Sequence, residues 1–67
     1  MSTTGTVKWF NLDKGYGFIA PDDGSADLFA HHSAVVDHDR GLTEGQHVSF
    51  DVAEGPKGRQ AEHIALA

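Results

Sequence analysis

The chain has 67 residues, with ten acidic and five basic side chains and a net charge of −5 at pH 7. A chain of this length makes one small domain with a limited core, so we expect a single domain over residues 1–67. It has no cysteine, which excludes disulfides and thiolate metal sites, and no apolar run near the roughly 20 residues that span a membrane. With no signal peptide at its start, we expect a cytoplasmic protein.

The net negative charge argues against a polyanionic partner, but the charges are unevenly distributed. Residues 21–54 hold eight acidic side chains and one basic side chain, Arg40, whereas residues 1–20 and 55–67 each carry a net charge of +1. This distribution is compatible with a nucleic-acid partner, and we expect it to be held by ring stacking more than by charge.

Residues 5–12 predict a first strand, because Thr6 and Val7 are β-branched. Trp9 and Phe10 are adjacent, so in a regular strand they point to opposite faces. A bulge or strong twist would let both rings contribute to the surface; otherwise one of them lies in the core. We expect Trp9 to be the exposed ring.

Residues 14–19, Lys-Gly-Tyr-Gly-Phe-Ile, predict a second strand after a tight connection. Alternation places Tyr16 and Phe18 on one face and Ile19 on the other. Exposed rings beside Lys14 indicate a binding surface, and this pattern is typical of strands that stack unpaired bases while a cation contacts phosphate. We interpret the two glycines beside Tyr16 as leaving space for whatever approaches the rings.

Residues 27–31 predict a third strand of the same design, after a turn at residues 21–25. Its side chains alternate: Leu28 and Ala30 face inward, and Asp27, Phe29 and His31 face outward. If the second and third strands pair as a hairpin, Phe18 and Phe29 become neighbours on one face, with Tyr16 and His31 nearby.

Two more strands are expected at residues 46–54 and 59–66, with these side chains inward: Val48, Phe50 and Val52 in the fourth strand, and Ile64 and Leu66 in the fifth. The sequence shows no helical periodicity of useful length. Five short strands must close on themselves to hide their edges, so we expect an all-β fold, a small antiparallel barrel.

The segment Gly-Thr-Val-Lys-Trp-Phe-Asn at residues 5–11, followed by residues 14–19 and 27–31, resembles the bacterial cold-shock protein family. The resemblance covers essentially the whole chain. It implies a five-stranded antiparallel OB-fold barrel that binds single-stranded RNA and DNA, with a role as an RNA chaperone or transcription antiterminator. By position it implies a nucleic-acid-binding surface made of Lys8, Trp9, Lys14, Tyr16, Phe18, Asp27, Phe29 and His31, with Lys57 at a basic position of the last loop.

Residue chemistry, apart from the resemblance, indicates two more candidates: Arg59 as a phosphate contact and His32 as a stacking or hydrogen-bonding group. The alternative for the lysines and Arg59 is that they are ordinary solvated charges, and the closeness of Lys8 and Lys14 to the rings favours phosphate contact for those two. Asp27 could accept hydrogen bonds from a base amine or pair with a nearby lysine. Adjacent strand residues point apart, so His31 and His32 are poorly placed to bind one ion, and we expect no metal and no cofactor.

Three positions depart from the family pattern. His32 stands where many members have an aromatic residue, Ala30 replaces a common valine, and the loop at residues 36–42 has no aromatic and is about one residue short. Since stacking contributes roughly 1–3 kcal/mol per base, we expect weaker binding or a shorter footprint than in a relative with all the rings.

The leading interpretation is a monomeric, sequence-tolerant single-strand binder without catalysis. Two alternatives come from other classes of function. A small nuclease could use His31 or His32 with Asp27 as an acid–base pair. A protein-interaction module could bind basic partners through the acidic middle segment, residues 21–54.

Overall fold

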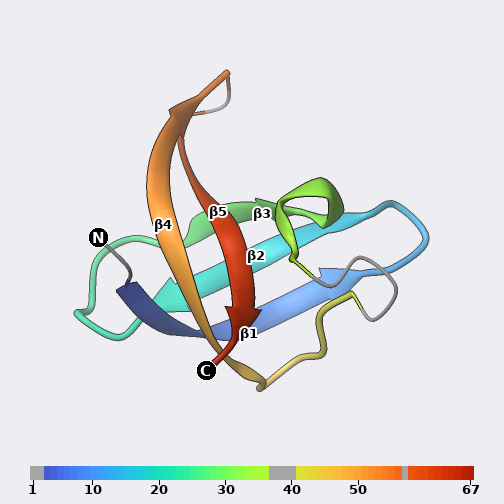
Figure 1. Ribbon diagram of the computed structural model, residues 1–67, viewed down its shortest axis with the longest axis horizontal. Coiled ribbons are helices and arrows are strands. Elements are labelled where there is room, and N and C mark those ends of the chain that lie inside the picture. The colour runs from blue at the N-terminus through green and yellow to red at the C-terminus, as the bar shows by residue number, and fades with distance from the viewer. Residues whose placement is uncertain (1–2, 37–40, 57) are drawn as a thin grey trace.

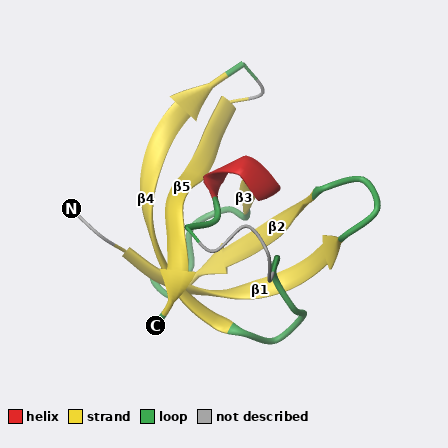
Figure 2. Ribbon diagram, turned by 45° about the vertical axis from the view of Figure 1, so that its right-hand side comes forward, coloured by secondary structure: helices red, strands yellow, loops and turns green. Residues whose placement is uncertain are grey.

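The computed structural model describes residues 3–36, 41–56 and 58–67, and five strands in these residues form a closed barrel. The strands are β1 (Thr3–Asn11), β2 (Tyr16–Pro21), β3 (Leu28–His31), β4 (His47–Gly55) and β5 (Gly58–Leu66). The β4–β5 hairpin crosses in front of β1, β2 and β3 (Figure 1). A short 3-10 helix, His32–Ala34, follows β3 and lies between that hairpin and the β1–β2 turn (Figure 2).

The strands follow the order β1-β2-β3-β5-β4 around the barrel, and β4 closes it against β1. Four of the neighbouring pairs are antiparallel, but β3 and β5 run parallel, with Phe29 opposite Gln60. The prediction of a five-stranded barrel is confirmed. The prediction that the barrel is antiparallel is corrected for one pair of strands, and we call this parallel pairing of β3 with β5 the parallel seam. Strand directions cannot alternate all the way around a ring with an odd number of strands, so one parallel pair is required.

The barrel interior is filled by apolar side chains, as is usual for small barrels. The buried core consists of Val7, Ile19, Leu28, Ala30, Val35, Leu42, Val48, Phe50, Ala61 and Ile64. The prediction that Val52 and Leu66 point inward is wrong, because these side chains are 38% and 53% exposed. The pairing of β4 with β5 shifts between Ser49 and Asp51, just before Val52, and Leu66 is the last residue of β5.

The irregularity expected near the two adjacent rings of β1 is present. The pairing of β1 with β2 shifts between Val7 and Trp9, which places Lys8 at a bulge. Trp9 is 39% exposed, whereas Phe10 is partly buried and packs against the core. The bulge therefore turns Trp9 outward while the next ring covers the barrel end, as predicted for Trp9.

Gly17 is required by packing inside the barrel wall. A Cβ atom on Gly17 would lie 2.2 Å from the Trp9 carbonyl oxygen and 2.7 Å from Phe10 Cα. Both atoms belong to the backbone of β1, so they cannot move aside as a flexible side chain can. The interpretation of this glycine as space for a ligand above the rings was wrong: it allows β1 and β2 to approach each other.

Asp22 connects the β2–β3 turn to the first strand and to β4. Its Oδ2 accepts a 2.7 Å hydrogen bond from Thr4 Oγ1 and lies 3.1 Å from His47 Nε2. These contacts, first that with His47 and then that with Thr4, lower the pKa of the Asp22 carboxyl in the folded state. A lowered pKa stabilises the fold at pH values above the unfolded-state pKa, and this contribution is lost as pH falls through the folded-state pKa.

We therefore expect Asp22→Asn to lower the urea midpoint of unfolding at pH 7, because the substitution removes an ionised acceptor. The difference from the wild type should shrink as the pH falls through the folded-state pKa, because protonation then removes the same charge from the wild-type side chain. The Asp13→Asn variant makes the same charge change in the β1–β2 turn and serves as the control. A deficit in Asp22→Asn that did not shrink as the pH was lowered would contradict this account.

Candidate nucleic-acid interface

Six aromatic and imidazole rings lie together on the outer side of the barrel. They come from three neighbouring strands and the start of the short helix, and we call them the ring face: Trp9, Tyr16, Phe18, Phe29, His31 and His32. The register explains the cluster, because Phe18 lies opposite both Trp9 on β1 and Phe29 on β3, and Tyr16 lies opposite His31. The hairpin predicted from the alternation of β2 and β3 is confirmed.

The rings form a continuous row. Tyr16 and Phe29 are stacked, with centroids 5.7 Å apart and planes inclined by 24°, and His31 continues the stack 6.4 Å beyond Phe29. Phe18 meets Phe29 edge-on at 6.1 Å. At the other end, the Trp9 ring is 5.7 Å from Tyr16 and 5.6 Å from Phe18. Neighbouring rings therefore hold each other in place.

The ring face is not part of the core. Its Phe and Tyr side chains are half-buried, its histidines are exposed, and the buried residues of the same strands, such as Ile19 and Leu28, lie on the opposite side of the sheet. An exposed cluster of large apolar groups of this kind marks a binding surface. Flat rings held at fixed positions suit the stacking of flat ligands.

His31 and His32 lie closer together than the sequence predicts. Their ring centroids are 4.5 Å apart, because the chain leaves the extended conformation at His32, where the 3-10 helix begins. The backbone N–H of His32 donates to the Gly15 carbonyl at 2.8 Å, and Gly15 has a φ of 77°. A Cβ atom on Gly15 would lie 2.5 Å from His32 Cδ2, so this glycine lets the imidazole pack against the β1–β2 turn.

The expectation that the two histidines point apart was therefore wrong. His31 is engaged locally: its Nδ1 accepts a 3.2 Å hydrogen bond from the Ser33 backbone N–H and lies 2.8 Å from the Ser33 hydroxyl. Among the residues that the structure describes, no group of three or more His, Asp or Glu side chains is arranged to hold a metal ion.

Lys8 lies at the edge of the ring face and forms an ion pair. Its Nζ donates to Asp27 Oδ2 at 3.0 Å, and the two side chains are 61% and 36% exposed. Of the two roles considered for Asp27, the ion pair with a lysine is the one present in the structure. Exposed ion pairs contribute little to stability, about 0–1 kcal/mol, so a phosphate can compete for Lys8.

The remaining basic candidates are less closely tied to the rings. Lys14 is exposed in the β1–β2 turn and lines the same shallow hollow as His32. Arg59 is exposed near the start of β5, and its positive charge contributes to the lowered pKa of Asp23, after the hydroxyl and backbone hydrogen bonds from Ser25. Lys57 lies outside the described residues.

The sequence reasoning missed two polar side chains beside the ring face, Gln60 and Glu62 on β5. The parallel pairing of β3 with β5 puts Gln60 directly opposite Phe29. Their alternation around the buried Ala61 would have indicated that both face outward. What the sequence did not reveal is that β5 lies next to β3.

A closed five-stranded barrel with rings on the outer face of its second and third strands has the architecture of the OB-fold, a class of oligonucleotide- and oligosaccharide-binding barrels. Residues 3–67 match the family model described as the 'Cold-shock' DNA-binding domain, and the chain belongs to this family. The resemblance found in the sequence motifs is confirmed.

Several bacterial relatives are similar over nearly the whole chain. The cold shock-like protein CspA of Stigmatella aurantiaca is 58% identical over 62 residues, which is 91% of each chain. The cold shock-like protein CspI of Escherichia coli is 55% identical over 91% of this chain and 89% of its own. Among solved structures, Drosophila Unr CSD456 matches with a TM-score of 0.83 and 27% identity, covering 100% of this chain and 27% of that one.

The described residues contain no helix that is long and apolar enough to cross a membrane.

Proposed function

We propose that the chain binds single-stranded RNA and DNA by stacking unpaired bases on the ring face, with Lys8, Lys14, Lys57 and Arg59 near the phosphates. The observation that carries this proposal is the continuous outward row of six rings. Stacking on aromatic side chains accepts any base, since every base has a flat π-face. Bases inside a duplex are already stacked and paired, so single strands should be strongly preferred.

The same mechanism accounts for a role as an RNA chaperone or transcription antiterminator. A base stacked on the protein cannot pair with another base, so the bound RNA stays unfolded without ATP. We infer that residues 1–67 act as one domain and as a monomer in the cytoplasm. Because His32 replaces an aromatic and residues 36–42 contain none, we also infer a shorter footprint than in relatives that carry those rings.

The experiment that tests this proposal is the opening of an RNA hairpin labelled with a fluorophore and a quencher at its ends. We expect stoichiometric protein to raise the fluorescence in the absence of ATP and to leave end-labelled RNA uncut. A closed hairpin in the presence of saturating folded protein would contradict the chaperone role. Cleaved RNA would instead favour the nuclease alternative.

The structure gives little support to the alternatives. Asp27 is paired with Lys8 and His31 is hydrogen-bonded to Ser33, so the carboxylate and the imidazole of a nuclease pair are engaged with different partners. In the acidic middle segment, Asp22 lies against His47 and Asp51 lies 3.2 Å from His63 Nδ1. Two of the acidic side chains that would attract a basic protein are thus already in contact with histidines of the same chain.

Asp27→Asn should tighten the binding of oligothymidine about two- to threefold. The substitution removes a negative charge beside the rings and leaves Lys8 free to contact a phosphate, and an exposed pair of this kind contributes about 0–1 kcal/mol. Thymine has no exocyclic amine, so a base contact to the Asp27 carboxylate cannot offset this gain. Titrations at one fixed salt concentration measure the effect.

Oligocytidine is the matched ligand, because its exocyclic N4 amine can donate to a carboxylate. If Asp27 also accepts from bases, the gain seen with oligothymidine should shrink or reverse with oligocytidine. Weaker oligothymidine binding by Asp27→Asn would show that the ion pair does not compete with phosphate.

A further inference from the structure

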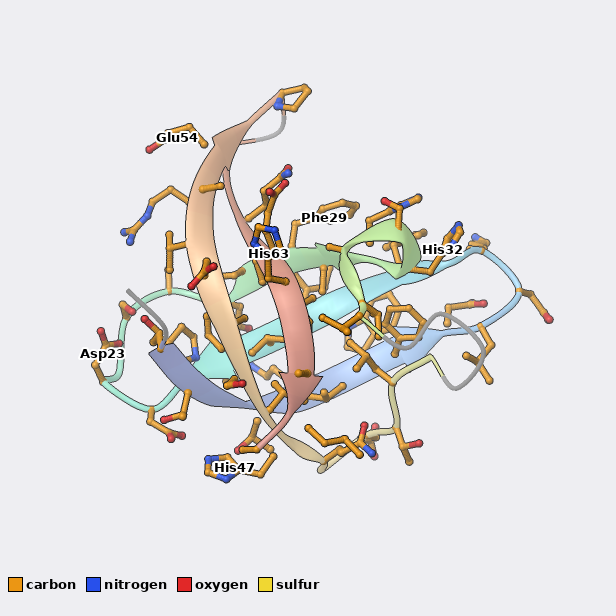
Figure 3. All side chains as sticks on the ribbon, viewed as in Figure 1. Asp23, Phe29, His32, His47, Glu54 and His63 are labelled. Carbon is orange, nitrogen blue, oxygen red and sulfur yellow. The ribbon has the colours of Figure 1, made fainter. Side chains whose placement is uncertain are left out.

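A hollow of about 270 Å³ lies beside the ring face, along the parallel seam between β3 and β5. Phe29 and His31 line one side, Gln60 and Glu62 line the other, and residues of the short helix and its C-terminal end complete it. Phe29 and His63 lie on these two neighbouring strands, on the upper side of the barrel (Figure 3). Pockets for small molecules typically measure about 300–1,000 Å³. The hollow is slightly smaller than this range, so it suits a group no larger than a single base.

The polar wall of the hollow is ordered by its own contacts. Gln60 and Glu62 flank the buried Ala61, so both side chains face outward on the side of the ring face. Gln60 Nε2 donates to Glu62 Oε1 at 3.0 Å, which orients the carboxylate. A carboxylate has about four lone-pair sites, so it can accept further hydrogen bonds after this one.

The charge around the hollow disfavours a phosphate. Glu62 lies opposite Asp51 on β4, and Asp51 lies 3.2 Å from His63 Nδ1. The described residues that line the hollow include Glu62 and the two histidines His31 and His63, but no Lys or Arg. A nucleic-acid strand that follows the ring face would therefore present a base here and keep its phosphates on the side of Lys8 and Lys14.

The carboxylate also distinguishes between bases. Two carboxylate oxygens are matched best by two adjacent N–H donors, and on the Watson–Crick edge this arrangement belongs to guanine, through N1–H and the N2 amine. Uracil and thymine flank their single N–H with carbonyl oxygens, which a carboxylate repels. Adenine and cytosine place a ring-nitrogen acceptor beside their amine. Unpaired bases are commonly recognised on these edges while they stack on aromatic side chains.

We propose that the hollow at the β3–β5 seam is a guanine-preferring subsite, in which the Glu62 carboxylate accepts hydrogen bonds from N1 and N2 of a base stacked beside Phe29 and His31. This inference rests on the proposed function, since it names a specificity within the same single-strand surface. It makes the protein sequence-tolerant along most of the bound strand and selective at one position.

The test is a position scan with heptathymidine in which one guanine replaces thymine at each place in turn. We expect one or two positions to bind about five- to tenfold more tightly than heptathymidine itself, as a good two-bond contact to a base edge provides. Inosine at that position lacks the N2 amine and should lose most of the gain. 7-Deazaguanine should keep the gain in affinity, because its Watson–Crick edge is the same as that of guanine.

Glu62→Gln should abolish the guanine preference, so that the guanine-containing strand and heptathymidine bind this variant with the same affinity. The matched control is Glu54→Gln, which removes the same charge from an exposed position near the β4–β5 turn, away from Phe29 (Figure 3). This variant should keep the preference. Circular dichroism establishes that both variants are folded.

The outcomes distinguish a failure of the proposed function from a failure of the guanine subsite. If heptathymidine does not bind, the proposed function itself fails. If heptathymidine binds but no position prefers guanine, or if Glu62→Gln keeps the preference, the ring face binds single strands and the guanine subsite is refuted.

Discussion

Phe29→Ala is expected to weaken the binding of oligothymidine about tenfold or more. Phe29 is the central ring of the row, with Tyr16, Phe18 and His31 all within 6.4 Å of it, centroid to centroid. Removing it takes away one stacking platform, worth roughly 1–3 kcal/mol per base, and also releases the rings that it holds in place. Each 1.4 kcal/mol corresponds to a factor of ten in affinity.

The loss should appear in the dissociation constant measured by titration at one fixed salt concentration. Leu66→Ala is the control, since Leu66 is an apolar side chain that is 53% exposed at the end of β5, outside the ring face. It should bind like the wild type. If Phe29→Ala remained folded and bound oligothymidine with unchanged affinity, the ring face would not be the binding surface.

Gly17→Ala is expected to lower the free energy of unfolding by about 3 kcal/mol or more. The added methyl group would meet the β1 backbone at 2.2 Å, and overpacking that no rotamer change can relieve lies at or above the usual range of about 1–3 kcal/mol. A barrel of 67 residues has a small margin of stability, so the variant should be largely unfolded near 37 °C.

Gly24→Ala provides the comparison for this effect. Gly24 has a φ of 83° in the β2–β3 turn, and a Cβ atom there would meet no other atom within 4 Å. Its substitution should therefore lower stability by about 1–2 kcal/mol, from backbone conformation alone. Urea unfolding of both variants separates the two costs. Equal destabilisation would show that close packing of β1 and β2 is not what requires glycine at position 17.

The strands and most of the ring face could be predicted from the sequence because they follow from local alternation. In the first four residues of β2 and in β3, every second side chain is a ring or an imidazole, and the residues between them are small or apolar. The pairing of Phe18 with Phe29 then needs only that β2 and β3, which are consecutive in the chain, form a hairpin. The exposed Trp9 followed from two adjacent rings that a regular strand cannot place on one face.

The features that the sequence did not predict depend on contacts between distant segments. The parallel seam that places Gln60 beside Phe29 arises from closing five strands into a ring, which no local pattern encodes. Val52 alternates with Phe50 in the sequence, but the pairing of β4 with β5 shifts between Ser49 and Asp51, and Val52 is 38% exposed. His31 and His32 were expected to point apart as adjacent strand residues do, but a short helix begins at His32 and their ring centroids lie 4.5 Å apart.

The role of Gly17 also depends on a contact with another strand, so the sequence did not predict it. A glycine beside a ring on a strand is compatible with either a ligand above it or a strand beneath it. The distances to Trp9 and Phe10 decide for the strand. The sequence located the residues of the candidate site, and the structure shows which neighbours fix their positions.

The most direct test of the central claim is a titration of Trp9 fluorescence with a short oligothymidine, alongside a duplex of the same length. Trp9 is the only tryptophan in the chain and lies 39% exposed at one end of the ring face. The account predicts saturable quenching by the single strand and none by the duplex at the same concentrations. Equal quenching by both ligands, or no response to either from folded protein, would contradict a surface that binds single strands by stacking.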